Sequence, residues 1–519
     1  LIDLINKDGT LKEVAGKFAG LTIHEARKQT IEALKQSGEL ISQKHIVHSV
    51  KVHERCDSEI EFVNTKQWFI KYLDMKDKLL QAGNHLNWNP KHMKTRYDNW
   101  IHGLKWDWCI SRQRFSGVPF PVWYCKDCEE VILADQKDLP VDPLNSNPAI
   151  SECPKCGCQD FVPEKDVLDT WATSSLTPQL STELFPEACD KIFPMSLRPQ
   201  GHDIITFWLF NTVVKSQLHY NVNPWQDVTI SGFVLDPHGK KMSKSKGNVV
   251  SPQQVLENYG ADCLRFWVSG VKLGEDILYQ EKDLVTGQKF ITKLWNASKL
   301  AIMNLEGYKG EKPTQFEYID KWILSKLNGL IKSSTENFEN YDYSRPKSQT
   351  ENFFWHQVCD NYLEIVKDRL YNPDKYGPEA KISAQYTLYN LILGTLKLMA
   401  PIMPFVTEEI YHLYFNAVEG CDSIHNSQWP GYDENMFDAT AEQAGELVVN
   451  IASSVRKAKS DAQMSLKQPL TEVLVKGRIS EDSFEKVKQE IMAVTKAENV
   501  AYEILSDDSE EDYYCDIKF

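Results

Sequence analysis

Apolar positions are spaced in two ways along the chain, and the change of spacing separates an α/β part from a helical part. Between residues 165 and 270, short apolar runs alternate with helix-like stretches. The predicted elements are a strand ending at Leu197, a helix over 203–218, a strand over 227–235 and a helix from Pro252 past Arg265. Strand, helix, strand and helix in this order predict a parallel sheet covered by helices.

Helical spacing dominates from about residue 284 to residue 415, where no strand pattern is convincing. One predicted helix face carries residues at intervals of three and four, namely Trp355, Val358, Tyr362, Ile365, Val366 and Arg369. The charged residues Asp360, Glu364, Lys367 and Asp368 fall at other positions, as they do in an amphipathic helix of a bundle. Thr407, followed by Glu408 and Glu409, is expected to cap a further helix.

The two ends of the chain predict smaller mixed units. Thr22 and Glu25 fit a capping box for a helix that ends by Gly38, and β-branched residues over 41–52 predict a strand. After about residue 440, a helix leads into a strand, helix, strand unit. The acidic run 506–512 is expected to be a solvated tail.

Composition limits the classes of protein to which the chain can belong. Hydrophobic residues make up 42% of its 519 residues and aromatic residues 11%, which suits large cores and excludes a disordered chain. A net charge of −15 means that any RNA contact must use local basic patches, such as Arg456, Lys457 and Lys459. No apolar run reaches the roughly 18 residues of a membrane span, and no secretory signal pattern is present, so we expect a cytosolic location.

Four of the twelve cysteines have metal-ligand spacing, although twelve are too few for a disulfide scaffold in a chain of this length. The pairs are Cys125 with Cys128, and Cys153 with Cys156. Two pairs with two intervening residues bind Zn²⁺ tetrahedrally in closed structural sites. We therefore predict a zinc ribbon at about residues 120–162, with Cys158 as a spare thiol that could substitute.

A second group of possible ligands consists of His45, His48, His53 and Cys56. A strand would turn alternate residues to opposite faces. A surface or packing role is therefore favoured over a second metal site.

The strongest chemical signal is a lysine-rich motif over residues 239–248. It reads Gly239-Lys240-Lys241-Met242-Ser243-Lys244-Ser245-Lys246-Gly247-Asn248. Ammonium and hydroxyl donors between two glycines suit a polyphosphate ligand. A solvated basic turn is the alternative, but the motif follows a predicted strand and precedes a predicted helix.

Residues 198–208 have the composition of a ligand-binding turn. Gly201 lets the backbone approach a ligand, Asp203 supplies a carboxylate for an ammonium group, and Ile204 and Trp208 offer apolar walls. The alternative is that Ile204 and Trp208 are ordinary core residues.

Lys241-Met242-Ser243-Lys244-Ser245 matches in full a signature of the class I aminoacyl-tRNA synthetases, and residues 198–208 resemble the ribose and amino-acid binding turn of that family. The resemblance implies an α/β, Rossmann-type catalytic fold in which an amino-acid carboxylate attacks the α-phosphate of ATP. Positioning and charge neutralisation then carry catalysis. By this resemblance the catalytic residues are Lys244 and Lys241. ATP contacts would also come from Ser243, Ser245, Gly201 and His202, and the amino-acid pocket would hold Asp203, Ile204, Trp208 and Trp171.

Residues 169–178, with Asp169-Thr170-Trp171, look like the valine-specific branch of the family. An isoleucine-specific member is the alternative, and Trp171 would also fit as a buried aromatic residue. The segments 352–364 and 399–409 resemble the family's anticodon-binding bundle. The implied ligands are tRNA(Val), valine and ATP with Mg²⁺, besides structural Zn²⁺. A monomeric cytoplasmic enzyme without membrane contact is expected, and a non-catalytic tRNA- or RNA-binding protein is a further alternative.

The resemblance also implies four domains. These are an editing-domain remnant at 1–60, the second half of the catalytic domain at 61–283, a helical anticodon-binding domain at 284–440 and a small α+β domain at 441–519. Trp108 to Gln113 resembles the return from the inserted editing domain to the catalytic core. The family's His-x-Gly-His signature does not occur in the chain. The first catalytic half and the deacylase residues of the editing domain are expected before Leu1, which predicts that the 519 residues alone are inactive.

Overall fold

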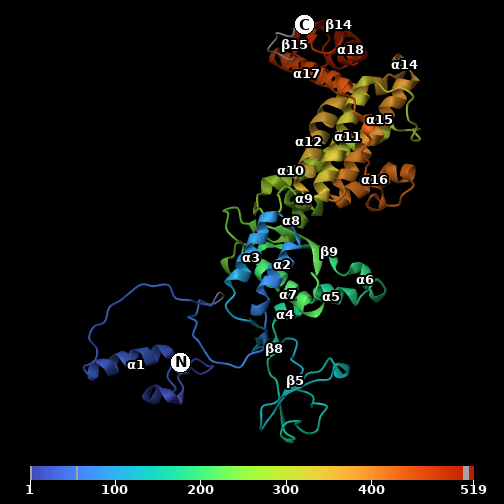
Figure 1. Ribbon diagram of the computed structural model, residues 1–519. Helices are drawn as coiled ribbons and strands as arrows, with labels where there is room; N and C mark the ends of the chain where they lie inside the picture. The colour runs from blue at the N-terminus through green and yellow to red at the C-terminus, as the bar shows by residue number, and fades with distance from the viewer. Residues whose placement is uncertain (1–2, 54–56, 506–512) are drawn as a thin grey trace. The chain divides into compact units, whose positions relative to one another are not determined.

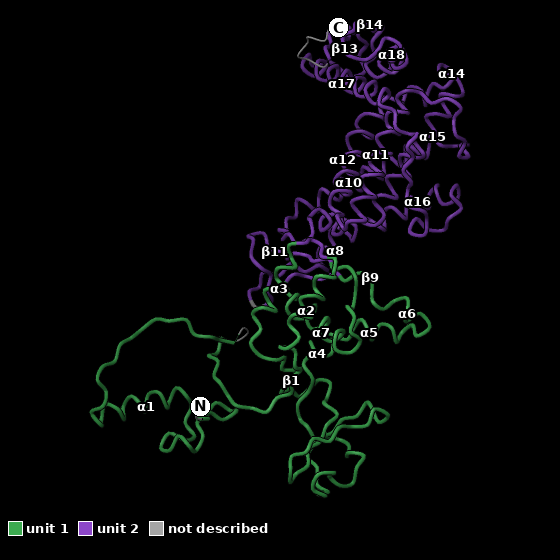
Figure 2. Tube along the Cα trace, in the orientation of Figure 1, with its two compact units in different colours: residues 1–87, 92–198, 203–228 green, residues 88–91, 199–202, 229–519 purple. Residues whose placement is uncertain are grey.

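The computed structural model describes residues 3–53, 57–505 and 513–519, while the side chain of Ser245 lies outside the described part. Cys56 and the acidic run 506–512, both singled out above, also lie outside it. The chain divides into two compact units (Figure 2). Unit 1 comprises residues 1–87, 92–198 and 203–228, and unit 2 comprises residues 88–91, 199–202 and 229–519.

Figure 1 shows helix α1 (Ile23–Gln36) near the start of unit 1. Its N-terminus has the predicted capping box. The Thr22 hydroxyl accepts the Glu25 N–H, and the Glu25 carboxylate accepts the Thr22 N–H. The strand predicted over 41–52 is wrong. Among the described residues of that stretch, Val52 alone takes part in β pairing, through a single bridge. A strand needs a hydrogen-bonding neighbour, which β-branched composition cannot supply.

A helical layer of unit 1 consists of α2 (Lys76–Asn84), α3 (Lys94–Gly103) and α7 (Phe210–His219). The Tyr97 ring of α3 lies so close to Gly83 that a Cβ on that glycine would sit 2.5 Å from the ring. The Tyr97 hydroxyl donates to the Leu79 carbonyl at 2.9 Å, which locks α3 onto α2. This layer supports the segment that leads into the candidate site.

The remaining strands of unit 1 form small sheets. The elements are β1 (Phe69–Ile70) with β3 (Trp108–Cys109), β4 (Ser111–Arg112) with β8 (Val167–Leu168), and a sheet β6-β5-β7 of Val131–Leu133, Val122–Cys125 and Phe161–Pro163. All of these pairings are antiparallel. Short helices α4 (Thr170–Ser174), α5 (Thr177–Thr182) and α6 (Cys189–Ile192) follow.

A further three-stranded sheet has the order β2-β10-β9, formed by Asn87–Asn89, Trp225–Ser231 and Met195–Gly201. The predicted order of strand, helix, strand and helix is confirmed, but the elements are interrupted. Instead of one helix over 203–218, the chain forms a 3-10 turn η6 (His202–Ile204), a π turn η7 (Ile205–Leu209) and then α7. Such turns are frequent at functional sites.

Glycines break the other two predicted elements. The strand predicted over 227–235 ends at Ser231, before Gly232, where a Cβ would lie 2.1 Å from the Glu275 carbonyl oxygen. The chain resumes as β11 (Val234–Leu235), which pairs in parallel with β12 (Ile277–Leu278). The helix predicted from Pro252 is divided at Gly260, with a φ of +81°, into α8 (Pro252–Tyr259) and α9 (Ala261–Val268).

The predicted helical bundle is confirmed in unit 2, and no strand occurs over 284–415, where every residue is described. Its helices are α10 (Glu281–Asn304), α11 (Tyr318–Glu339), α12 (Ser344–Asn352), the π helix η9 (Phe353–Tyr362), α13 (Leu363–Tyr371), α14 (Pro373–Tyr376), α15 (Pro378–Met399) and α16 (Pro404–Glu419). The residues of the predicted face from Val358 to Arg369 are all buried. Trp355, at the start of the face, is half-buried.

Thr407 does not cap α16, contrary to the prediction. The helix starts at Pro404, and the Thr407 hydroxyl donates to the Met403 carbonyl inside the first turn. The buried carboxylate of Asp262, on α9, accepts the N–H groups of Phe405 and Val406 instead. A carboxylate at a helix N-terminus satisfies free donors and opposes the helix dipole, so a residue remote in sequence has taken the role.

Arg369 is buried because it has a buried partner in the bundle. Its guanidinium donates to both carboxylate oxygens of Asp320, at 2.9 and 2.7 Å. Tyr362 and Ser383 donate to the same carboxylate through their hydroxyls. Arg369 and Asp320 are 1% and 0% exposed, so the pair satisfies charges that burial would otherwise make very costly.

The last part of unit 2 contains α17 (Ala439–Asp461), β13 (Leu470–Gly477), α18 (Glu481–Thr495), β14 (Ala497–Ile504) and β15 (Tyr513–Lys518). The predicted strand, helix, strand order is confirmed, with β13 and β14 paired in parallel. The sequence did not predict β15, which pairs antiparallel with the other edge of β13. One apolar core runs through the bundle and this α+β part.

The basic patch expected on α17 is largely wrong. Lys459 is 1% exposed, and its ammonium donates to the carbonyls of Leu466, Gln468 and Thr495. Arg456 donates to the Asp360 carbonyl and to Asn361. Lys457 alone of the three predicted residues is exposed.

Candidate functional site

The lysine loop, residues 236–248, lies between β11 and α8 of unit 2. An antiparallel bridge between Leu235 and Lys241 closes the first turn of the loop. Gly239 turns the chain with a φ of +76°, and Gly247 ends a 3-10 turn over Lys244–Lys246 with a φ of +67°. Glycine is the residue that adopts such backbone at little cost, so both glycines of the motif have a structural role.

The lysines of this loop are available for an external anion. Among the described residues, no ion pair involves Lys240, Lys241, Lys244 or Lys246. Lys240, Lys241, Lys244 and Lys246 are also exposed. Four uncompensated ammonium groups on one short loop form a site suited to a polyphosphate.

Phe233 connects the lysine loop with the predicted ATP-binding turn inside unit 2. The Lys241 ammonium lies 4.2 Å from the centre of the Phe233 ring, a cation–π contact. The His202 ring meets the same phenyl ring edge to face, with centroids 4.3 Å apart. The other side of His202 faces Asp276, with Nε2 3.7 Å from the carboxylate. The structure therefore brings His202 and Lys241 to one aromatic side chain, which the sequence motifs did not reveal.

The predicted amino-acid residues in unit 1 include two tryptophans in defined contacts. Trp171, on α4, stacks on Phe207 with centroids 5.7 Å apart and an angle of 18° between the rings. Trp208 donates through its indole N–H to the Ser174 carbonyl at 3.1 Å. The ring stack and the hydrogen bond thus both connect residues 169–178 with residues 198–208. Phe207 is 44% exposed, so the stack is open to solvent on part of its surface.

Arg198 covers one face of Trp208, with its guanidinium carbon 3.1 Å from a ring centre. Burial lowers the pKa of Arg198 to about 10, and its Nε has no hydrogen-bond partner among the described atoms. Arg198 stood in the motif without an assigned role. A cation stacked on an indole has to be seen in three dimensions, because no spacing rule predicts it.

Asp203 and Ile204 sit in the 3-10 turn η6, where Asp203 is exposed and Ile204 half-buried. The turn replaces the α-helical geometry that placed Ile204 one turn before Trp208. Their common role in a pocket stays a prediction. Gly201 is half-buried at the end of β9.

Two other sequence motifs meet at the start of α4. Asp169 is buried, and its carboxylate pairs with Arg112 at 3.1 Å. Its backbone N–H donates to the Ile110 carbonyl at 2.7 Å. The segment Trp108 to Gln113 therefore positions the Asp169-Thr170-Trp171 motif, and the Asp169 carboxylate has a structural partner.

The four predicted metal ligands come together at one end of the sheet β6-β5-β7. The sulfur atoms of Cys125, Cys128, Cys153 and Cys156 all lie within 4.8 Å of one another. Two tight turns aim them inward. In the first, Cys125 N–H donates to the Glu130 carbonyl, and in the second Cys153 N–H donates to the Cys158 carbonyl. Gly157 has the positive φ of +76° that the second turn requires.

The distances fit a tetrahedral zinc ion. Zinc–sulfur bonds of about 2.3 Å place tetrahedral sulfurs roughly 3.8 Å apart, and the pairs Cys125–Cys156 and Cys128–Cys153 measure 3.5 and 3.6 Å. The Cys128 backbone N–H lowers the pKa of Cys125 to about 6, which favours the thiolate that a metal binds. Cys158 is not part of the cluster, because its sulfur accepts the Asp160 N–H.

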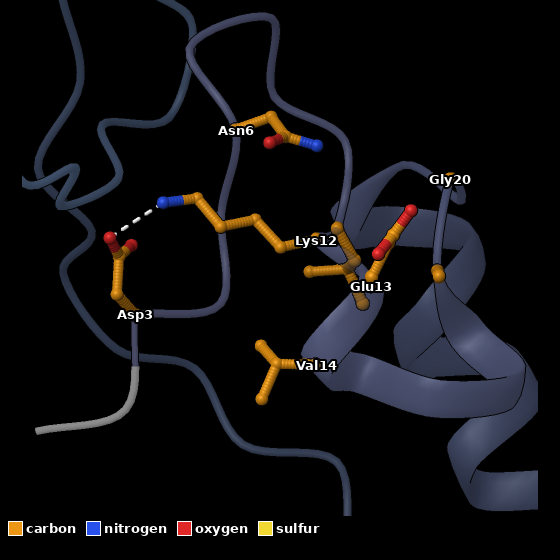
Figure 3. Close-up of a pocket in the computed structure, with 8 residues that line it drawn as sticks. Asp3, Asn6, Lys12, Glu13, Val14 and Gly20 are labelled. Atoms are coloured by element: carbon orange, nitrogen blue, oxygen red, sulfur yellow. Dashed lines mark hydrogen bonds and ion pairs between the residues drawn. The ribbon is translucent and has the colours of Figure 1, made fainter.

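A hollow of about 830 Å³ near the N-terminal end contains none of the predicted site residues (Figure 3). Its lining residues are Asp3, Asn6, Leu11, Lys12, Glu13, Val14, Ala19 and Gly20. The Lys12 ammonium and the Asp3 carboxylate form an ion pair of 2.6 Å across it. Size alone therefore does not identify the functional site of this chain.

Two parts of the chain match known protein families. Residues 6–280 match tRNA synthetases class I (I, L, M and V), and residues 320–475 match the anticodon-binding domain of tRNA ligase. The chain therefore belongs to the class I tRNA synthetases, as the lysine motif predicted.

Its relatives include several valine–tRNA ligases. Those of Picrophilus torridus and Thermoplasma volcanium are each 43% identical to the chain, over 93% and 91% of its length, and that of Rickettsia conorii is 40% identical over 97%. The chain spans 62%, 59% and 63% of these three proteins, respectively.

Solved structures show the same fold at lower identity. A leucyl-tRNA synthetase of Agrobacterium radiobacter K84 in a ternary complex superposes with a TM-score of 0.50 at 19% identity, covering 77% of this chain and 51% of that one. Methionyl-tRNA synthetase of Mycobacterium tuberculosis with methionyl-adenylate gives 0.51 at 20%, covering 72% and 69%. None of the helices formed by the described residues has both the length and the apolar content that crossing a bilayer requires.

Proposed function

We propose that this chain is the part of a valine–tRNA ligase that carries the lysine loop and the anticodon-binding bundle. The observation that supports this most directly is the combination of a complete, unpaired lysine loop with relatives that are named valine–tRNA ligase at 40–43% identity. The reaction joins the valine carboxylate to the α-phosphorus of ATP and releases pyrophosphate. The activated valyl group then passes to the terminal ribose of tRNA(Val) with release of AMP.

In this proposal Lys244 and Lys241 are the catalytic residues. They neutralise charge that moves onto the leaving pyrophosphate, an effect that preorganised cations provide without a protein nucleophile. Ser243 and Ser245 assist in ATP binding, and Gly201 with His202 holds the nucleotide from β9 and η6. The Lys241 ammonium lies 4.2 Å from the centre of the Phe233 ring but is exposed and forms no ion pair among the described residues, so it keeps donors for a phosphate oxygen.

Valine binding is assigned to Asp203, Ile204, Trp208 and Trp171. The Asp203 carboxylate is exposed and suits the α-ammonium group, and the Trp171–Phe207 stack offers an apolar surface to the side chain. Arg198 fixes the face of Trp208 and leaves its ring orientation well defined.

The other assignments follow from the same proposal. ATP enters with Mg²⁺, and the cysteine quartet binds a structural Zn²⁺. The protein acts as a cytoplasmic monomer without membrane contact. Residues 1–60 belong to an editing domain, 61–283 to the catalytic domain with its ribbon at 120–162, 284–440 to the anticodon-binding domain and 441–519 to a small α+β domain.

The decisive experiment is ATP–pyrophosphate exchange in an extended chain, one with the full length of the valine–tRNA ligases of which the present chain spans 59–63%. Lys244→Ala should lower the exchange rate by roughly 10² or more and leave valine affinity within a few-fold, as expected for one lost preorganised charge contact. Lys240→Ala, outside the five-residue signature, is the matched control and should change the rate little. A harmless Lys244→Ala would refute the catalytic role of the loop.

Substrate choice is tested in the same assay. Valine should exceed isoleucine because one extra methylene in a tight apolar pocket is worth roughly 10–200-fold. Preference for isoleucine would refute the valine assignment. Binding of tRNA without exchange by the extended chain would favour a non-catalytic RNA-binding protein.

A further inference from the structure

The base of the lysine loop is closed by two side chains that lie outside the five-residue signature. Asp236 is 4% exposed, and its Oδ1 accepts the N–H groups of His238 and Lys240 at 2.9 and 2.8 Å. Its Oδ2 accepts from the side-chain amide of Asn248 at 2.8 Å. The first and last turns of the loop are therefore joined through one carboxylate–amide contact.

The amide of Asn248 also sets the backbone of the signature itself. Its Oδ1 accepts the Ser243 N–H at 2.9 Å, and its Nδ2 donates to the Lys241 carbonyl at 3.2 Å. One side chain thus holds the backbone on both sides of Met242. Lys244 follows directly as the first residue of the 3-10 turn.

The choice of partners for Asp236 has an electrostatic consequence. A buried carboxylate beside four lysines would ordinarily attract an ammonium group and form an ion pair. Here its partners are two backbone N–H groups and an amide, and these donors, Asn248 foremost, hold the pKa of Asp236 below its usual range. The carboxylate is satisfied without a lysine, so the loop keeps its full positive charge for a ligand.

We propose that Asp236 and Asn248 are positioning residues that shape the lysine loop for phosphate and keep its ammonium groups unpaired. The proposal rests on the proposed function for the identity of the ligand, while the loop geometry stands on the five hydrogen bonds above. Neither residue is expected to touch substrate.

An isosteric exchange of the two side chains provides the test. Asn248→Asp sets two carboxylates against each other, and Asp236→Asn sets two amide donors against each other. The double variant Asp236→Asn/Asn248→Asp restores the pairing in the opposite direction. In that variant the amide oxygen at position 236 still accepts from His238 and Lys240, and the carboxylate at position 248 still accepts from Ser243. Of the five bonds, the one to the Lys241 carbonyl alone is lost, and there a carboxylate oxygen faces the carbonyl oxygen.

Trypsin sensitivity measures the shape of the loop in the 519-residue chain without any ligand, because trypsin cleaves after lysine. Each single variant should raise the rate of cleavage at the loop by roughly tenfold or more, as expected when hydrogen bonds at its base are lost. The double variant should recover most of the difference from the original rate, since it keeps four of the five hydrogen bonds. Glu257→Gln, an exposed carboxylate on α8, is the control and should not change the rate.

Kinetics of the extended chain connect this geometry with catalysis. The single variants should lower kcat for pyrophosphate exchange by roughly tenfold with little change in the KM for valine, and the double variant should recover most of the loss. Unchanged cleavage in the single variants, or a double variant no better than either single variant in cleavage, would overturn the proposal. Rescue of loop cleavage by the double variant, combined with a harmless Lys244→Ala, would refute the proposed function and leave the positioning role intact.

Discussion

The cysteine ribbon, residues 120–162, and the helical bundle contrast in how much apolar surface they bury. In the ribbon, buried apolar residues are few, with Val122, Trp123 and Ile132 among them, while Val131, Leu133 and Val162 of the same small sheet are exposed. The bundle instead buries a continuous core from Phe290 to Phe415. Small units that cannot bury enough apolar surface generally need covalent or metal cross-links. We therefore expect the ribbon to depend on its four sulfurs and the bundle to depend on side-chain packing.

The bundle buries a charged pair at its centre, whereas the ribbon gathers four cysteine sulfurs at one end of its sheet. The Asp320–Arg369 pair is completely enclosed by helices. If one partner is replaced, the other stays buried away from water. Three substitutions separate these two sources of stability, and they follow in order of decreasing effect.

The largest effect is expected from Cys153→Ser. Loss of a thiolate should release the zinc and with it binding free energy on the order of 10 kcal/mol, which holds the ribbon folded. Hydrogen exchange should show residues 120–162 losing protection while α10 to α16 keep theirs, and metal analysis should show less than one zinc per chain. Cys158→Ser, outside the cluster, is the control and should retain the metal. Metal-free protein with a fully protected ribbon would contradict the comparison.

The next largest effect is expected from Asp320→Asn in the bundle. Arg369 would lose the carboxylate to which its guanidinium donates inside the bundle, and breaking such a buried pair costs about 3–5 kcal/mol of unfolding free energy. Thermal or urea unfolding measures the loss, and zinc content should not change. Glu364→Gln is the control. It breaks an ion pair with Lys367 on the surface of α13, the helix that carries Arg369, and should cost less than about 1 kcal/mol. Equal effects of the two substitutions would mean that burial of the pair is energetically unimportant.

A smaller, pH-dependent effect is expected from Glu490, which is 5% exposed on α18. Burial raises the pKa of Glu490 to about 7, against an attraction from Arg369 and with repulsion from Glu317 and Asp320. Because the folded pKa is raised, the protonated carboxyl favours folding. That contribution is complete below about pH 4.5 and is lost as pH rises through about 7.

Glu490→Gln mimics the protonated form and should remove this loss. The variant should match the original chain at pH 5 and exceed its unfolding free energy by about 2–3 kcal/mol at pH 8. Urea unfolding at the two pH values measures the difference. Glu485→Gln, at an exposed position on the same helix, should show no such change. A pH-independent difference for Glu490→Gln would contradict the ionisation argument.

Patterns that depend on neighbouring residues were predictable from sequence. The Thr22 capping box, the bundle face from Val358 to Arg369 and the two cysteine pairs all follow from spacing along one segment. The sequence also placed Arg369 on this face but predicted no partner for it. Its partner Asp320 lies 49 residues away, and no local rule connects the two.

Features that depend on remote contacts were missed or predicted wrongly. Residues 41–52 have strand composition, but strand formation needs a neighbour that the described chain does not provide. Thr407 has the composition of a cap, but Asp262 reaches the helix start from another helix. The partners that shape the candidate site, Phe233 with Lys241 and Asp236 with Asn248, are set by turns that motif matching does not describe.

The two lysines near the end of α17 supply a built-in reporter of unfolding. Lys457 is exposed, whereas Lys459 holds three carbonyl oxygens in a buried position. An amine-reactive reagent should therefore modify Lys457 at once and Lys459 at the rate at which the α+β part opens. Because both side chains fall in the same short stretch of sequence, the ratio of their labels in a mass spectrum cancels differences in recovery and records that opening directly.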